Sequence, residues 1–346
     1  MSRGRPRPDG PALSVVLSTL GNYETLEKVL DGYSKQSADP ESFEVVVATD
    51  AADPHPEAVD TAIGARRFET RRITGPVPGL SANRNAGIEA ARASLILLTD
   101  NDTIPVRRLV SEHLAWHRRH QQPNVGVQGR VRWSRELEVS IFMRWLDTGI
   151  QFDFANIRGT EAGWGRFAGA NVSFKKDFAQ RVGDFDQQHF PYGYEDTDWA
   201  YRASKLGFRL LYNRRAVVDH LRPMTLEFWQ KRARRVAVAE QTFVRLHPEM
   251  SPWFYGIFSA ASKEPPGRGR GVPLAPYVPR WAPLLGPRVW RSVDRTFTQA
   301  IAPYFLSSWE EALALRDATG EDLPAAPDLS EFLSDSPGGS PPGGPK

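Results

Sequence analysis

Three short apolar runs, each ending in polar residues, constrain the fold of this chain most strongly. They read LSVVLS over 13–18, FEVVVATD over 43–50 and LILLTD over 95–100. Continuous apolar runs of this length are typical of strands buried on both faces. Helical patterns follow these runs at about 22–36 and 105–120, and another helix is expected after a loop, with Ser81 as its N-cap. The alternation predicts an α/β fold in which helices cover both faces of a mostly parallel sheet.

Composition divides the chain into four parts. Residues 1–12 and 319–346 are rich in proline and glycine, which predicts disordered tails. The α/β pattern occupies 13–222, and we expect a helical C-terminal extension over 223–318, with helices at 225–246 and 288–317. RLLYN and AVVDH, before residue 221, are expected to form a pair of strands.

The totals exclude several classes of protein. With no cysteine, disulfides and thiolate metal sites are excluded, so a metal would need oxygen or imidazole ligands. A net charge of +3 is small for 346 residues, and no nucleic-acid partner is expected. No apolar run is long enough for a membrane span or a signal peptide, so we expect a cytoplasmic protein.

Polar side chains stand at the ends of all three apolar runs. They are Ser18, Asp50 and the pair Asp100 and Asp102. Ligands bind at the carboxyl ends of strands in such sheets, so these side chains are expected to share one crevice. Two carboxylates in a tight turn can hold Mg or Mn together with substrate phosphates. The alternative is an ordinary polar turn.

Three further segments carry groups that could do chemistry. Glu195 and Asp196 begin a predicted helix, where acids either stabilise the helix dipole or serve as a general base. His220 ends an apolar run and is either a packing residue or a nitrogen ligand to a metal. Arg84 precedes or opens a helix, where it would pair with phosphate or lie on a capped surface helix.

In their order along the chain, these motifs resemble the inverting GT-A glycosyltransferases of the family 2 type. The series runs STLGN, ATD, SANRNAG, TDNDTIP, GANVSF, YEDTD and a strand-ending histidine, over about 13–222. The stretch from FAGANVSF to SKLGF is similar to the C-terminal catalytic module of the β-1,4-galactosyltransferases. The resemblance implies a GT-A fold, with a Rossmann-like sheet that binds a nucleotide sugar.

The resemblance also implies a role for each site residue. Ser18, Asp50, Arg84 and Asp100 would bind the nucleotide, Asp102 and His220 would bind the metal, Asp196 would be the catalytic base, Glu195 would position the sugars, and Gly169, Ala170 and Asn171 would line the sugar site. Trp164, Tyr192 and Tyr194 are expected either to stack on sugar rings or to pack ordinarily. One departure is Thr49, which stands where the family often has an acid.

The expected activity is metal-dependent, inverting transfer of a sugar from a nucleotide diphosphate sugar, with UDP-sugars favoured. The acceptor would be a hydroxyl of a glycan, a lipid-linked substrate or a small natural product, and the metal would be Mn or Mg. Two alternatives remain open: a non-catalytic nucleotide-sugar-binding protein and a nucleotidyltransferase. The second lacks support because STLGNYET carries no basic residue.

The basic helix at 225–246 and the apolar segment after it allow two interpretations. Phe228 and Trp229 lie beside several arginines, a pattern found in helices at anionic membrane surfaces. Peripheral membrane contact through 225–258 is therefore one reading. Packing of this helix against the catalytic domain is the other, and it is favoured.

Overall fold

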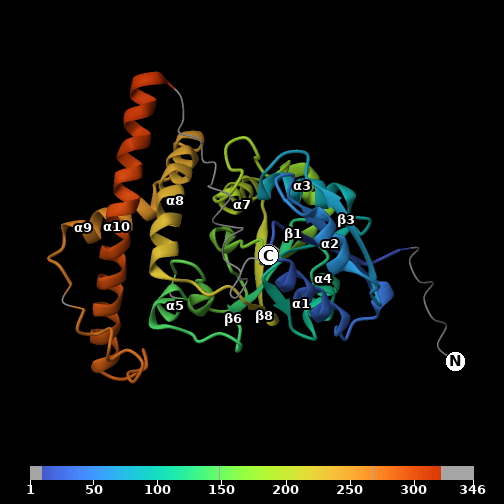
Figure 1. Cartoon of the computed structure of the whole chain (residues 1–346), viewed down its shortest axis with the longest axis horizontal. Coiled ribbons are helices and arrows are strands. Elements are labelled where there is room, and N and C mark those ends of the chain that lie inside the picture. Colours follow the sequence, from blue (N-terminus) through green and yellow to red (C-terminus); the bar gives the residue numbers. More distant parts are fainter. Residues whose placement is uncertain (1–9, 148, 268, 321–346) are drawn as a thin grey trace, which may run out of the picture.

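In the computed structural model, which describes residues 10–147, 149–267 and 269–320, helices cover both faces of a central sheet (Figure 1). Most of the tails predicted at 1–12 and 319–346 lies outside these ranges. Among the described residues, no helix combines the length and the apolar character that a membrane crossing needs.

The sheet has eight strands in the described residues, in the order β3-β2-β1-β4-β7-β6-β8-β5. They are β1 Leu13–Thr19, β2 Phe43–Thr49, β3 Glu69–Thr74, β4 Leu95–Asp100, β5 Thr103–Pro105, β6 Val125–Trp133, β7 Asn171–Lys175 and β8 Arg209–His220. The first four run parallel to one another, and β6 is parallel to β8. Strand β7 is antiparallel to both its neighbours, and β5 is antiparallel to β8. The predicted α/β class and mostly parallel sheet are confirmed.

Successive side chains of a strand point to opposite faces of the sheet, and in the central strands the side chains on both faces are apolar. Helices therefore cover both faces of the sheet. The α-helices are α1 Tyr23–Ser34, α2 Pro56–Ile63, α3 Leu80–Ala90, α4 Leu109–Arg119, α5 Ile141–Leu146, α6 Lys176–Val182, α7 Glu195–Lys205, α8 Leu226–Leu246, α9 Trp253–Lys263 and α10 Leu285–Thr319; the 3-10 turns are η1 Pro40–Ser42, η2 Phe154–Asn156 and η3 Trp164–Arg166. In β1, Val15 packs in a core with Leu26 of α1, whereas Val16 packs in a second core with Phe178 of α6 and Trp199 of α7.

The last three helices share a core with the sheet. Trp229 of α8, Phe258 of α9 and Phe305 of α10 are all buried, and they belong to the same apolar cluster as Val15. Figure 1 shows α8 between the sheet and α10. The extension predicted from 223 onward is therefore helical, as expected, while the exact domain boundary stays a prediction. The burial of Trp229 agrees with the favoured reading that this helix packs on the protein, and contact of 225–258 with a membrane is not shown.

Local details differ from the sequence prediction in three places. Ser81 is not an N-cap, because α3 begins one residue earlier and the Ser81 hydroxyl donates to the Phe190 carbonyl. The helix predicted from 105 begins at Leu109, since 103–105 instead pair with β8. RLLYN and AVVDH are one strand, with an irregularity in its pairing with β6 rather than a turn.

Because α10 packs in the shared core, truncating one of its buried side chains should lower the free energy of unfolding strongly. Phe305→Ala should lower the free energy of unfolding by about 3–5 kcal/mol, because a fully buried ring is removed and its cavity refills only in part. Urea denaturation of the whole chain measures this, with Ser307→Ala on the exposed side of α10 as the matched control. A loss no larger than in the control would mean that α10 does not share the core.

Candidate active site

Arg84 of α3 brings the predicted site segments together. Its Nη1 lies 2.9 Å from Glu195 Oε1 and 2.8 Å from Asp196 Oδ1, and its Nη2 lies 3.6 Å from Asp100 Oδ1. Arg84 is only 2% exposed, so the guanidinium is shielded from bulk water, whereas Asp100 and Asp196 keep part of their side chains exposed. One guanidinium thus joins the end of β4 to the start of α7.

The backbone around Asp196 explains why this arrangement forms. The amide of Gly169 donates to Asp196 Oδ2 at 2.9 Å, which fixes the second carboxylate oxygen. A Cβ on Gly169 would lie 2.1 Å from Arg84 Nη2, so only glycine leaves room for the guanidinium. Tyr194, which precedes α7, takes a left-handed conformation at φ 68° and turns the chain into the helix.

Burial changes the ionisation of the carboxylates around Arg84. It raises the pKa of Asp100 to about 7, and the charge of Arg84 acts in the opposite direction. Burial and the neighbouring Asp196 raise the pKa of Glu195, again opposed by Arg84. Shifted pKa values of this kind are typical of functional sites.

The sequence-predicted metal ligands lie side by side. His220 Nε2 is 3.5 Å from Asp102 Oδ2, because β5 pairs Thr103 with His220 across the sheet. Oδ1 of Asp102 and Oδ1 of Asp100 are buried without a hydrogen-bond partner among the described residues. A carboxylate and an imidazole placed like Asp102 and His220 suit a hard divalent cation whose remaining ligands are substrate oxygens. Among the described residues, no group of three or more His, Asp or Glu could hold a metal, so this pair would depend on those further ligands.

The nucleotide-binding candidates on β1 and β2 occupy two different environments. Ser18 pairs with Asp100 across β1 and β4, and its hydroxyl is buried without a hydrogen-bond partner in the described chain. Asp50 is buried and accepts hydrogen bonds from the amides of Ala52 and Gly79, from the Asn83 side chain and from the Tyr192 hydroxyl.

Asp50 therefore holds the loop before α3 in place. Its predicted contact with the nucleoside stays a prediction. Tyr192 is likewise engaged by this carboxylate, so the structure gives its hydroxyl a role in anchoring the loop. Asp53, which sequence analysis missed, anchors the end of β1 by accepting from the Gly21 amide and the Tyr23 hydroxyl.

The predicted sugar-site residues separate into lining and buried positions. Gly169 lies directly beside Arg84 and Asp196, and its contact with a sugar stays a prediction. Asn171 is fully buried, donates to the carbonyls of Arg130 and Ala216, and contacts the His113 imidazole. Trp164 packs edge-on against Tyr201 of α7. Asn171 therefore joins buried strands and α4 in the core of the protein.

Glu240 of α8 is a second residue that sequence analysis missed. It accepts a hydrogen bond of 2.6 Å from the Tyr194 hydroxyl and 2.8 Å bonds from the amides of Phe254 and Tyr255. It therefore caps α9 while holding the residue that precedes Glu195. The sequence carried one signal, because Glu240 falls on the apolar stripe of a helix, where a lone acid implies a buried partner.

Helix α8 also brings a cation toward the carboxylates of α7. Burial, with help from Arg235, lowers the pKa of Arg232 to about 10, while the charges of Glu195 and Asp196 act in the opposite direction. Arg232 therefore adds positive potential on the side of the site that faces the C-terminal helices.

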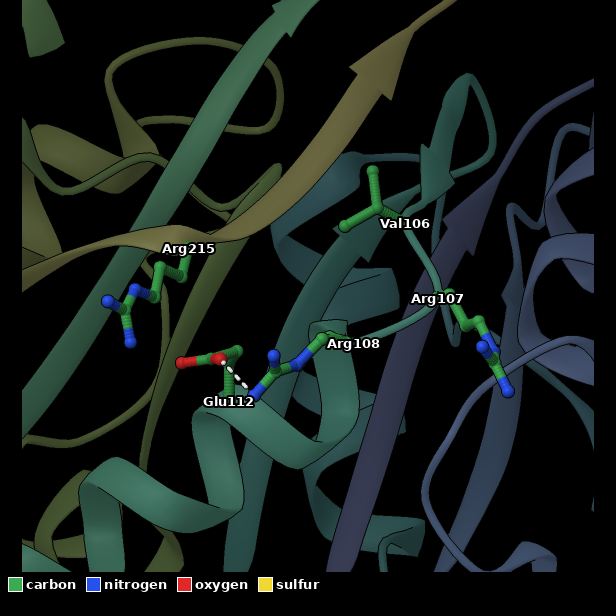
Figure 2. A pocket seen from close by; sticks show the side chains of 5 residues that line it. All are labelled: Val106, Arg107, Arg108, Glu112 and Arg215. Carbon is green, nitrogen blue, oxygen red and sulfur yellow. Dashed lines mark ion pairs between the residues drawn. The ribbon is translucent and has the colours of Figure 1, made fainter.

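A shallow pocket at the start of α4 is not part of this site. It is lined by Val106, Arg107, Arg108, Glu112 and Arg215. Figure 2 shows Arg107 and Arg215 pointing away from one another, with Arg108 paired to Glu112 between them. The guanidinium groups do not converge, so nothing in this pocket matches the chemistry around Arg84.

Comparison with known proteins adds a family and a set of relatives. Residues 11–239 match the family described as glycosyltransferase like family 2. Two relatives from Streptomyces hygroscopicus subspecies, both described as validoxylamine A glucosyltransferase, are 24% identical in alignments that cover 73% of this chain. Those alignments span 62% and 67% of the relatives' own lengths.

A solved structure shares the fold. It is a mannosyltransferase from Pyrobaculum calidifontis in complex with GDP-mannose and Mn²⁺. It is 19% identical and has a TM-score of 0.51, and the match covers 91% of this chain and 77% of that protein. The expected GT-A fold is confirmed, whereas the likeness to the β-1,4-galactosyltransferase module is not.

The contact with Glu240 predicts an anchoring role for Tyr194 that can be separated from sugar stacking. Tyr194→Phe keeps the ring but leaves Glu240 short of one hydrogen bond, so the free energy of unfolding should fall by about 1–3 kcal/mol. Urea denaturation measures the loss, with Tyr304→Phe on α10 as a control for removing a tyrosine hydroxyl. Unchanged stability would contradict the anchoring role.

Proposed function

Because this chain belongs to the glycosyltransferase-like family 2, we propose that it transfers a hexose from a nucleotide diphosphate sugar to an acceptor hydroxyl, with inversion at the anomeric carbon. One observation carries the proposal: Arg84 joins Asp196 to the strand end that holds Asp100 and Asp102. The proposed base, Asp196, and the strand end proposed to bind the polyphosphate thus lie on either side of the Arg84 guanidinium.

Asp196 is the proposed general base. It lies at the N-terminus of α7 and pairs with Arg84. Its side chain is 24% exposed, more than those of Glu195 and Arg84, so an acceptor hydroxyl can reach it. A carboxylate that removes the hydroxyl proton during a single displacement inverts the sugar without a covalent intermediate.

The leaving nucleotide diphosphate gains negative charge as the sugar departs. Asp102 and His220, with Asp100 beside them, would hold Mn or Mg at this edge of the sheet. A bound divalent cation supplies charge neutralisation for such a leaving group. Support comes from the buried Oδ1 atom of Asp102, which has no hydrogen-bond partner among the described residues, and from the Mn²⁺ in the mannosyltransferase structure that shares the fold.

The donor and acceptor are proposed from the relatives. A UDP-sugar is our first candidate donor, and the mannosyltransferase solved with GDP-mannose makes GDP-sugars the second to test. The relatives are named as validoxylamine A glucosyltransferases, which supports hexosyl transfer to a small molecule. Glycan and lipid-linked acceptors belong in the same panel.

Release of nucleotide diphosphate tests this proposal. With Mn²⁺, a panel of UDP- and GDP-sugars and a panel of acceptors, the wild type should release product from at least one pair. Asp196→Asn should lower the rate by about 10²- to 10⁴-fold because proton removal is lost, and a denaturation curve of the variant measures the separate cost of losing the ion pair with Arg84. Thr197→Ala, in the same helical turn, is the matched control. Donor binding without turnover across both panels would favour a non-catalytic binding protein.

The proposed metal ligand can be tested without turnover. Asp102→Ala should abolish the Mn²⁺-dependent part of donor binding, measured by calorimetry with and without EDTA, since one of two direct protein ligands is lost. Asp177→Ala removes an exposed carboxylate at the start of α6 and serves as control. If Asp102→Ala still binds donor more tightly with Mn²⁺, Asp102 is not a ligand.

A further inference from the structure

The segment between α9 and α10 exposes large apolar side chains. Tyr277 and Trp281 are each 83% exposed, Leu284 is 79% exposed, and Leu274 and Leu285 are about half exposed. Proteins rarely place several large apolar side chains in water along one short stretch unless it contacts another surface. Within 10–147, 149–267 and 269–320, the other large exposed apolar residues are Val77, Leu206 and Trp253, and each lies in a different part of the chain.

The charge of this segment has one sign. Between Glu264 and Asp294 the sequence contains five arginines and no acidic residue. Of these arginines, Arg270, Arg280, Arg288 and Arg291 are exposed in the structure. The apolar side chains are therefore set in a basic surface, although the whole chain carries a net charge of only +3.

The segment is anchored to the N-terminal part of α10. Ala275 and Val278 are buried, and the Trp290 indole donates to the Val278 carbonyl at 2.9 Å. The Gly271 amide donates to the Ser292 hydroxyl, and the guanidinium of Arg280 stacks on the Trp290 ring at 3.9 Å. Exposure of Tyr277 and Trp281 is thus a property of an anchored loop.

The position of the segment leaves its outer side open. Figure 1 shows it, in orange, beside and beneath the lower end of α10. No strand or helix of the described chain covers Tyr277, Trp281 or Leu284. We name Leu274, Tyr277, Trp281, Leu284 and Leu285, with Arg288 and Arg291, the 274–291 patch.

We propose that the 274–291 patch docks the protein onto the surface of a membrane that contains anionic lipids. Tryptophan and tyrosine prefer the membrane–water interface, and leucine side chains insert just below it. Arginines beside them are attracted to anionic headgroups, each by about 1 kcal/mol near the surface. Residues 265–293 carry arginines and no acid, with Asp147 and Asp294 near Arg280, and this charge favours an anionic lipid surface over a protein partner or a second copy. The proposal is independent of the sugar-transfer chemistry.

Vesicle binding by the whole chain tests the proposal. The probes are vesicles of phosphatidylcholine alone and of phosphatidylcholine mixed equally with phosphatidylglycerol. We expect binding to the anionic vesicles that weakens with salt, and little binding to the neutral ones. Tyr277→Ala/Trp281→Ala/Leu284→Ala should weaken anionic binding by about tenfold or more, because the inserted apolar area is lost. Leu206→Ala/Val77→Ala is the control for exposed apolar residues elsewhere.

Charge reversal separates headgroup attraction from insertion. Arg288→Glu/Arg291→Glu should weaken anionic binding by about tenfold or more. Arg118→Glu/Arg119→Glu makes the same change in net charge at the exposed end of α4 and should have a much smaller effect. Circular dichroism melts of all variants should match the wild type, because every altered side chain is exposed.

Fluorescence places the segment at the lipid. Brominated phosphatidylglycerol should quench the tryptophan emission of the wild type, and Trp281→Phe should keep binding while losing much of that quenching. Three results would overturn the proposal: no preference for anionic vesicles, equal binding by the triple variant, or concentration-dependent dimers that the triple variant abolishes. The last result would identify a second copy as the occupant.

Discussion

A buried arginine surrounded by carboxylates is the interaction on which this site depends. Arg84 is shielded from water and pairs with Glu195, Asp196 and Asp100. Removing one partner of such a group typically costs about 3–5 kcal/mol, because the remaining charges are left uncompensated. The same contacts align the start of α7 with the end of β4. Stability and site geometry therefore rest on the same side chain.

The C-terminal helices support the site from the other side. Glu240 of α8 holds Tyr194, and Tyr194 sets the direction in which α7 begins. Asp198, one turn into α7, pairs with Arg202 and with His247 just beyond α8. The residues around Asp196 are thus fixed both by the sheet and by α8. Helix α8 is part of the site's framework as well as a cover for the core.

Much of the fold could be predicted from the sequence because its signals are local. Apolar runs such as 13–18 and 95–100 are buried strands, and Asp100 and Ser18 lie at neighbouring strand ends as expected. The pairing of Asp102 with His220 also agrees with the motif series. The local pattern wrongly predicted Ser81 as an N-cap, because the Ser81 hydroxyl instead donates a hydrogen bond to the carbonyl of Phe190, far along the chain.

Contacts between distant segments could not be predicted in the same way. The partners of Arg84, Glu195 and Asp196, lie more than one hundred residues further along the chain, and its contact with phosphate stays a prediction. Three polar partners from other strands and α4 hold Asn171 in the core, and its contact with a sugar stays a prediction. No periodicity in a single sequence reports which buried polar groups pair across a fold.

The stereochemistry of transfer tests the central claim most directly. Proton NMR of the product formed from an α-linked nucleotide sugar gives the coupling constant of the anomeric proton of the transferred sugar, which reports whether the new linkage is α or β. If Asp196, held by Arg84, acts as the single base of one displacement, the transferred sugar is β-linked. An α-linked product would contradict this account, since retention needs a different arrangement of groups around the anomeric carbon.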